Sequence, residues 1–411
     1  MEDPRPAGRR RDTIALALGS GLSGLLAYVV FALSTRALGA EAAAPVSVLW
    51  TYWGFAAAAL TFPLQHWITR TVTVQGEGSV RHALPRVSMA VLASSIALGG
   101  LCWLGRMPLF HVDGVAWPAL VALLTLGSGV IGVVRGRLNA SRRYVSIGVS
   151  LVAENGLRCI AVGALFVSGV RDPSAYGLSL VAGHLVSVFW LRSVRFGTGV
   201  TTTERRRPLT FLTGAGSAQL LGQIVLTGSP VLLALAGGTP AAVTALFATL
   251  ALFRAPYLLA IGLVAQLSSK ISALVVAEET AALQRLRAAT LATTAVTVGL
   301  AGVFGVWLGP PVLRLIFGAT VHFDGMSSGV VAVACTLAVA NLVLVISILA
   351  HGRPRNAVIG WLGAFVVGGL AFLALGALPP SDRIVWCFLA AEAAAFAILS
   401  VGEAHFSRRK H

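Results

Sequence analysis

The chain of 411 residues is 56% hydrophobic and 11% charged, with a mean hydropathy of +0.84 and a formal net charge of +16. So much apolar surface exceeds what a water-soluble core can bury, and the bilayer must therefore be its solvent. The basic residues are spread over seven segments, which argues against a nucleic-acid-binding face, and the four cysteines lack the paired spacing of a disulfide framework or a metal site.

Twelve apolar stretches follow one another along the chain, each near the roughly 20 residues that a helix needs to cross the hydrocarbon. Only helices satisfy their backbone hydrogen bonds segment by segment in lipid, so we expect an all-α integral membrane protein with about 12 transmembrane helices. The short loops leave no room for a soluble domain. The expected spans are 13–35, 43–65, 87–105, 115–134, 145–168, 174–192, 210–236, 241–265, 288–309, 328–350, 357–378 and 384–406.

Lysine and arginine alternate between rich and poor connections. Of the 31 basic residues, 24 fall in seven segments and only five in the connections between them. Because positive charge resists translocation, this alternation predicts a multi-pass protein of the cell membrane with both termini in the cytoplasm. The rich segments are the N-terminal tail, 65–86, 135–143, 192–209, 266–288, 351–356 and the C-terminal tail.

Weak echoes relate the two halves of the chain. Pro45 and Pro240 each open the second span of their half, and Gln65 and Gln266 each end it. These pairs keep the same side and direction, which predicts two six-helix bundles related by a parallel pseudo-repeat. The expected parts are an N-terminal six-helix half (1–197), a basic cytoplasmic linker (198–209) and a C-terminal six-helix half (210–411).

Two arginines lie inside spans, and the first is Arg158, near the middle of 145–168. An arginine at the hydrocarbon centre costs at least about 2.5 to 3.5 kcal/mol unless it faces protein or water. Glu154 lies one turn earlier on the same helix face and can neutralise it, with Asn155 as a further hydrogen-bond partner. The pair is therefore either a buried structural ion pair or part of a substrate cavity.

The second is Arg254, about thirteen residues into the span 241–265, with no acidic residue three or four positions away. Pro256 removes a helix hydrogen bond and is expected to bend the span at the same depth. An unpaired cation beside such a bend is suited to hold an anionic substrate. The alternative is that an acid from another helix, Glu154 or Glu392, neutralises it.

Single polar residues occupy other spans. Gln219 and Gln223, one turn apart, either bind sugar hydroxyls or join helices. His184, Asn341 and Glu392 are interpreted as packing or pairing residues, with Glu392 also a candidate proton or cation site. The predicted substrate-binding residues are Arg254, Arg158, Gln219 and Gln223, and the predicted ion-coupling or charge-pairing residues are Glu154 and Glu392.

Motifs for catalysis are missing from the sequence. All six aspartates lie in tails or outer connections, and no P-loop, GxSxG, HExxH or paired carboxylate pattern is found. We therefore expect neither an enzyme nor a cofactor or metal.

Three short segments resemble one transporter family. Arg36-Ala37-Leu38-Gly39-Ala40-Glu41 is similar to the R-x-L-G-x-E turn of polysaccharide and oligosaccharide-lipid flippases. Arg135-Gly136 through Arg142-Arg143-Tyr144 resembles the basic turn after their fourth span, and Leu315-Ile316-Phe317-Gly318 resembles their L-x-F-G outer segment. The superfamily also contains multidrug and toxin extrusion exporters and the lipid II flippase. Ala43 and Ala44 depart from the family turn, and the lipid II flippase typically has two further spans.

The resemblance implies two bundles around a central cavity that opens alternately to either side. It implies a flippase that moves an undecaprenyl-diphosphate-linked oligosaccharide from the inner to the outer leaflet, coupled to a proton or cation gradient, with Arg254 and Arg158 holding the diphosphate or acidic sugars. The alternatives are a drug or metabolite exporter of the same superfamily and a non-transporting glycan polymerase or assembly partner. The expected partners are membrane lipid, the lipid-linked glycan and other polysaccharide-assembly proteins, and we expect a monomer.

Overall fold

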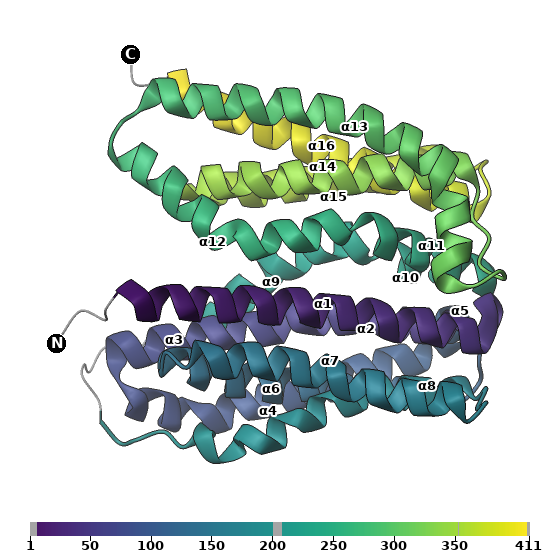
Figure 1. Ribbon diagram of the computed structural model, residues 1–411, viewed down its shortest axis with the longest axis horizontal. Helices are drawn as coiled ribbons and strands as arrows, with labels where there is room; N and C mark the ends of the chain where they lie inside the picture. Colours follow the sequence, from purple (N-terminus) through teal and green to yellow (C-terminus); the bar gives the residue numbers. More distant parts are fainter. Residues whose placement is uncertain (1–5, 200–207, 352, 409–411) are drawn as a thin grey trace. The chain divides into compact units, whose positions relative to one another are not determined.

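The computed structural model describes residues 6–199, 208–351 and 353–408, and every regular element in these ranges is a helix (Figure 1). The chain divides into two compact units, Met1–Gln223 and Ile224–His411. The predicted all-α, multi-pass membrane fold is confirmed. The expected linker 198–209 lies mostly outside the described residues, and the division falls inside helix α9, after the expected linker.

The first unit is organised around one central helix, α6. This helix packs against α2, α3, α4, α8 and η2, while α1 lies along α7. The elements are α1 Pro6–Ala42, α2 Ala44–Ala56, the π-helix η1 Ala57–Thr61, α3 Phe62–Gln75, α4 Glu77–Leu104, α5 Arg106–Phe110, α6 Ala116–Ala140, α7 Tyr144–Val167, α8 Pro173–Ala182 and the 3₁₀ helix η2 Gly183–Val194.

The second unit is organised around α14, which contacts α11, α12, α13, α15 and α16. Helix α16 also packs against α15 and α10, so α10, α14 and α15 surround it on several faces. The elements are α9 Pro208–Thr227, which begins in the first unit, α10 Ser229–Leu235, α11 Pro240–Phe253, α12 Ala255–Val276, α13 Thr280–Phe317, α14 Gly325–Ala350, α15 Pro354–Ala374 and α16 Pro380–Arg408.

Nine helical segments among the described residues are long and apolar enough to cross a membrane. The other three expected spans, 43–65, 210–236 and 241–265, coincide with interrupted helices. They break at η1, at Gly228 and at Arg254. A proline stands in the first turn after each break, Pro63, Pro230 and Pro256, where its missing N–H is harmless. A bend is expected at Pro256, and the structure has a helix interruption two residues earlier, at Arg254. The count of twelve spans stays a prediction.

The three segments that resemble the flippase family are turns with a left-handed residue. Gly39 has φ 79° at a kink inside α1, Arg142 has φ 56° between α6 and α7, and Gly318 has φ 107° after α13. Glycine adopts this conformation without steric cost, which explains two of the three positions. The helix α6 continues to Ala140, so Arg135, expected in a cytoplasmic connection, lies within a helix instead.

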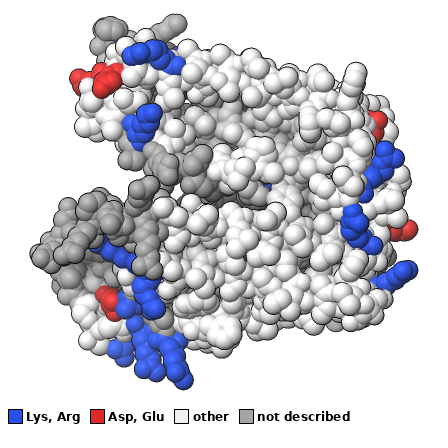
Figure 2. Space-filling view, viewed as in Figure 1, with Lys and Arg blue, Asp and Glu red and all other residues white. Residues whose placement is uncertain are grey.

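Charged side chains gather at the helix ends, and the surface between these ends is uncharged in Figure 2. Large apolar side chains are exposed in both units, for example Phe189 at 81% and Trp307 at 78% exposure. Such exposure is unfavourable in water and favourable in acyl chains. Lipid is therefore the solvent of these faces.

Candidate functional site

A buried ionic network lies inside the first unit, centred on Glu154 of α7. Glu154 Oε1 accepts a hydrogen bond from Arg158 Nη2 at 2.6 Å, and Oε2 accepts one from Arg135 Nη2 of α6, also at 2.6 Å. The three side chains are at most 7% exposed. His184 Nε2 of η2 lies 3.7 Å from Oε1. One carboxylate thus joins two guanidinium groups, and the network is held by α6, α7 and η2.

Arg158 uses all three of its nitrogens within the protein. Besides the bond to Glu154, Nε donates to the Leu180 carbonyl and Nη1 to Asn155 Oδ1, both at 2.8 Å. The guanidinium carbon lies 4.5 Å from the centre of the Trp53 ring, within the range of a cation–π contact. The side chain is fully buried. The predicted contacts with Glu154 and Asn155 are present, and the geometry favours the structural ion pair over a cavity residue.

Two glycines make room for this network. An added Cβ at Gly183 would collide with Arg158 Nε, and one at Gly127 would collide with the His184 ring. Arg135 is tied further to Ser150, whose Oγ accepts from Nε at 3.1 Å. Sequence reasoning missed Arg135 because its position near the end of α6 reads as a connection. The sequence signal that could have identified Arg135 is its position nineteen residues before Glu154, across the hairpin of α6 and α7.

Glu392 on α16 has different surroundings in the second unit. Its Oε2 accepts a hydrogen bond from Asn341 Nδ2 of α14 at 2.8 Å, and its backbone carbonyl accepts from the same nitrogen at 3.1 Å. Both side chains are completely buried. The ion pairs found among the described residues do not include Glu392. Glu392 Oε1 and Asn341 Oδ1 have no hydrogen-bond partner among the described residues.

Arg254 occupies the break between α11 and α12, where it ends one helix and starts the next. The side chain is half-buried, and its Nε is buried without a hydrogen-bond partner among the residues described. Within those residues neither Glu154 nor Glu392 forms an ion pair with it. Arg254 and Glu392 both lie within electrostatic range of Tyr257 and Cys335. The second unit thus holds a cation and an acid that act on the same two residues, and the ion pairs among the described residues do not join them.

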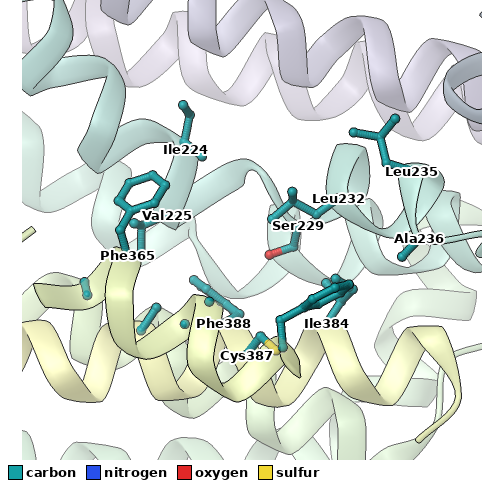
Figure 3. A pocket seen from close by; sticks show the side chains of 15 residues that line it. Ile224, Val225, Ser229, Leu232, Leu235, Ala236, Phe365, Ile384, Cys387 and Phe388 are labelled. Atoms are coloured by element: carbon teal, nitrogen blue, oxygen red, sulfur yellow. The ribbon is translucent and has the colours of Figure 1, made fainter. Parts of the chain in front are cut away.

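An apolar cavity of about 370 Å³ lies within the second unit, between α9 and α10 on one side and α15 and α16 on the other (Figure 3). Fifteen residues line it, and the only heteroatoms in their side chains are the Ser229 hydroxyl and the Cys387 sulfur. Phe365 and Phe388 face the cavity from α15 and α16. A site of this volume and lining suits an apolar group of drug-like size.

Gln219 and Gln223 lie on α9, in the last residues of the first unit. Gln219 is exposed and Gln223 is half-buried. Arg254 belongs to the second unit. The structure therefore brings Glu154 and Arg158 together, and it assigns the predicted sugar-binding glutamines and Arg254 to different units.

No family model matches the chain. Proteins described as uncharacterised from Mycobacterium bovis and Mycobacterium tuberculosis are 28% identical over 384 residues, which cover 86% of this chain and 83% of each relative.

Several solved structures share the fold. An inward-facing multidrug resistance MATE family transporter of the MOP superfamily aligns with a TM-score of 0.63 at 16% identity, covering 97% of this chain and 94% of its own. The lipid II flippase MurJ, in an inward closed conformation, aligns with a TM-score of 0.64 at 14% identity, covering 95% and 87%. A MOP superfamily transporter from Pyrococcus furiosus, described as having a binding pocket of reverse polarity, gives 0.62 at 14%, covering 97% and 94%. At these identities the likeness shows the fold.

Proposed function

We propose that this protein is a transporter of the MOP superfamily that flips a lipid-linked oligosaccharide of the undecaprenyl-diphosphate type from the inner to the outer leaflet. The two units would act by alternating access, for the synthesis of cell-surface polysaccharide. The shared fold with a lipid flippase and with exporters supports a transporter. The alternation of basic connections supports a cytoplasmic location of both termini.

The observation that carries the substrate class is Arg254. Arg254 lies at a helix break, and its buried Nε has no hydrogen-bond partner among the described residues, so it has hydrogen-bonding capacity for a ligand. A guanidinium group suits phosphate because its donors form a planar fork. A diphosphate or an acidic sugar fits this group best.

The other predicted residues take different roles in this proposal. Gln219 and Gln223 would bind sugar hydroxyls from α9. Arg158 and Glu154 would hold the first unit together, because their hydrogen-bonding groups are directed at each other and at neighbouring helices. Glu392 would be the group that couples transport to a proton or cation gradient, since it is a buried acid that forms no ion pair with another described residue.

The test is Arg254→Ala in a strain whose own copy of the gene is deleted. We expect loss of surface glycan with normal protein level and normal membrane insertion. Arg254→Lys should retain part of the output because it keeps the charge but not the fork. Arg285→Ala, at an exposed position on α13, is the control and should be neutral. Normal glycan output from Arg254→Ala would remove this residue from the mechanism.

The second candidate is a drug or metabolite exporter, and the apolar cavity favours it because its lining suits an uncharged apolar compound. Deletion of the gene would then raise drug susceptibility while surface glycan stays intact. The reverse pattern, lost glycan and unchanged susceptibility, would support the flippase.

A further inference from the structure

The orientation of the Asn341 amide is fixed by what it faces. Its Nδ2 lies 3.1 Å from the Glu392 backbone carbonyl, which can only accept a hydrogen bond. The nitrogen must therefore occupy this position, and the Asn341 Oδ1 points elsewhere. That oxygen and Glu392 Oε1 are both acceptors if the carboxyl group is ionised, and both are buried without a donor among the described residues.

We infer that Glu392 and Asn341 form a proton-binding site, in which the neutral carboxyl group and the amide exchange two hydrogen bonds. Asn341 Nδ2 donates to Glu392 Oε2, the contact seen at 2.8 Å. The protonated Oε1 donates in return to Asn341 Oδ1. A single proton thereby gives a partner to both unpartnered oxygens, and it removes the charge of a carboxylate that is completely shielded from solvent.

Comparison with Glu154 shows why burial alone does not decide the charge. Both glutamates are at most 3% exposed. Glu154 accepts hydrogen bonds from two guanidinium groups at 2.6 Å, so its charge is matched by cations. Among the described residues, the only side-chain donor to Glu392 is the Asn341 amide. A charged group in a membrane interior needs a partner of opposite charge. Glu392 avoids this need because its carboxyl group is protonated and therefore neutral.

The charged and titratable side chains on the helices around Glu392 provide no cation that pairs with it among the described residues, so a proton is the simplest ligand. Helix α14 contributes Asn341 and Cys335, and Arg254 and Tyr257 act on the same region from the α11–α12 junction. Helix α10 has no titratable side chain, and Arg355 at the start of α15 is the only one of that helix. On α13, which also contacts α16, the cations are Arg285, at an exposed position, Arg287, which lies 3.0 Å from Glu403, and Arg314 in the last turn.

Loss of the proton would link this site to Arg254. The resulting carboxylate would attract a cation, and Arg254 acts on the same two neighbours, Tyr257 and Cys335. A change in the charge of Glu392 would therefore change the electrostatic potential in the region on which Arg254 also acts. This coupling rests on the proposed transport function, while the protonation itself stands on the Asn341 contacts.

The protonation is measured by infrared spectroscopy on the full chain, purified into lipid bilayers at neutral pH without substrate. The C=O stretch of a protonated carboxyl group is separate from the carboxylate and amide bands, and it shifts in D₂O. We expect such a band in the wild type and its complete loss in Glu392→Gln. Glu403→Gln on the same helix is the matched control and should keep the band, because Glu403 pairs with Arg287.

Asn341→Leu is a second test of the protonation, and it does not depend on whether Glu392→Gln folds. Removal of the amide should move the band to higher frequency, because the carboxyl group loses both hydrogen bonds. Absence of the band in the wild type, its persistence in Glu392→Gln, or an unmoved band in Asn341→Leu would each overturn the inference. A band that behaves as expected, together with normal glycan output from Arg254→Ala, would leave the proton site standing and remove the proposed role of Arg254.

Discussion

Glu154→Gln tests whether the ionic network stabilises the first unit. The substitution keeps the size of the side chain but removes the charge that two guanidinium groups share. Arg158 is fully buried and Arg135 is 7% exposed, so water cannot take the place of the carboxylate. Removal of one partner from a buried ion pair costs about 3 to 5 kcal/mol. Because two cations lose their partner here, we expect the free energy of unfolding to fall by at least about 3 kcal/mol.

The control is a pair with the same geometry and different burial. Arg106 and Asp113 are also 2.6 Å apart, but their side chains are 28% and 72% exposed. Exposed pairs contribute about 0 to 1 kcal/mol, so Asp113→Asn should lower the free energy of unfolding by less than about 1 kcal/mol. Denaturant titration of both variants in one mild detergent, followed by circular dichroism, gives the comparison. Equal losses would refute the reasoning that burial sets the value of the network.

Three further outcomes are expected from the packing. Gly183→Ala should lower the free energy of unfolding by about 1 to 3 kcal/mol, because its Cβ collides with the network, whereas Gly163→Ala meets open space and should not. Gly369→Phe should abolish binding of an apolar fluorescent drug by filling the cavity, and Gly299→Phe, equally open but outside it, should leave binding unchanged. An apolar maleimide should label Cys387, and a bound drug should slow the labelling; equal rates with and without drug would place the drug elsewhere.

The elements and one local pair could be predicted from the sequence because their signals are local. Hydropathy predicted the apolar helices, nine of which are long enough to cross a membrane among the described residues, and the four-residue spacing on one helix predicted the contact of Glu154 with Arg158. Proline predicted the break beside Arg254. Each of these features depends on residues that are neighbours along one helix.

Features that depend on two helices were not predictable in this way. Asn341 and Glu392 are 51 positions apart, and nothing in either span indicates that one amide faces the other acid. The apolar cavity could not be predicted from the sequence for another reason. Its lining residues, such as Leu232 and Phe365, have the same composition as a face that meets lipid, so only packing distinguishes them.

The three interrupted spans have a consequence for hydration of the membrane interior. A helix break at hydrocarbon depth frees backbone carbonyl and N–H groups, and acyl chains offer them nothing in exchange. At these breaks Pro63, Pro230 and Pro256 lack the N–H that would bond the carbonyl one turn earlier, so that carbonyl is favoured where it faces protein or water. Pro85 inside α4 and Pro310 and Pro311 inside α13 impose the same restriction on two of the unbroken helices. Backbone carbonyls, and not only side chains, thus constrain how these helices rotate about their own axes in the bilayer.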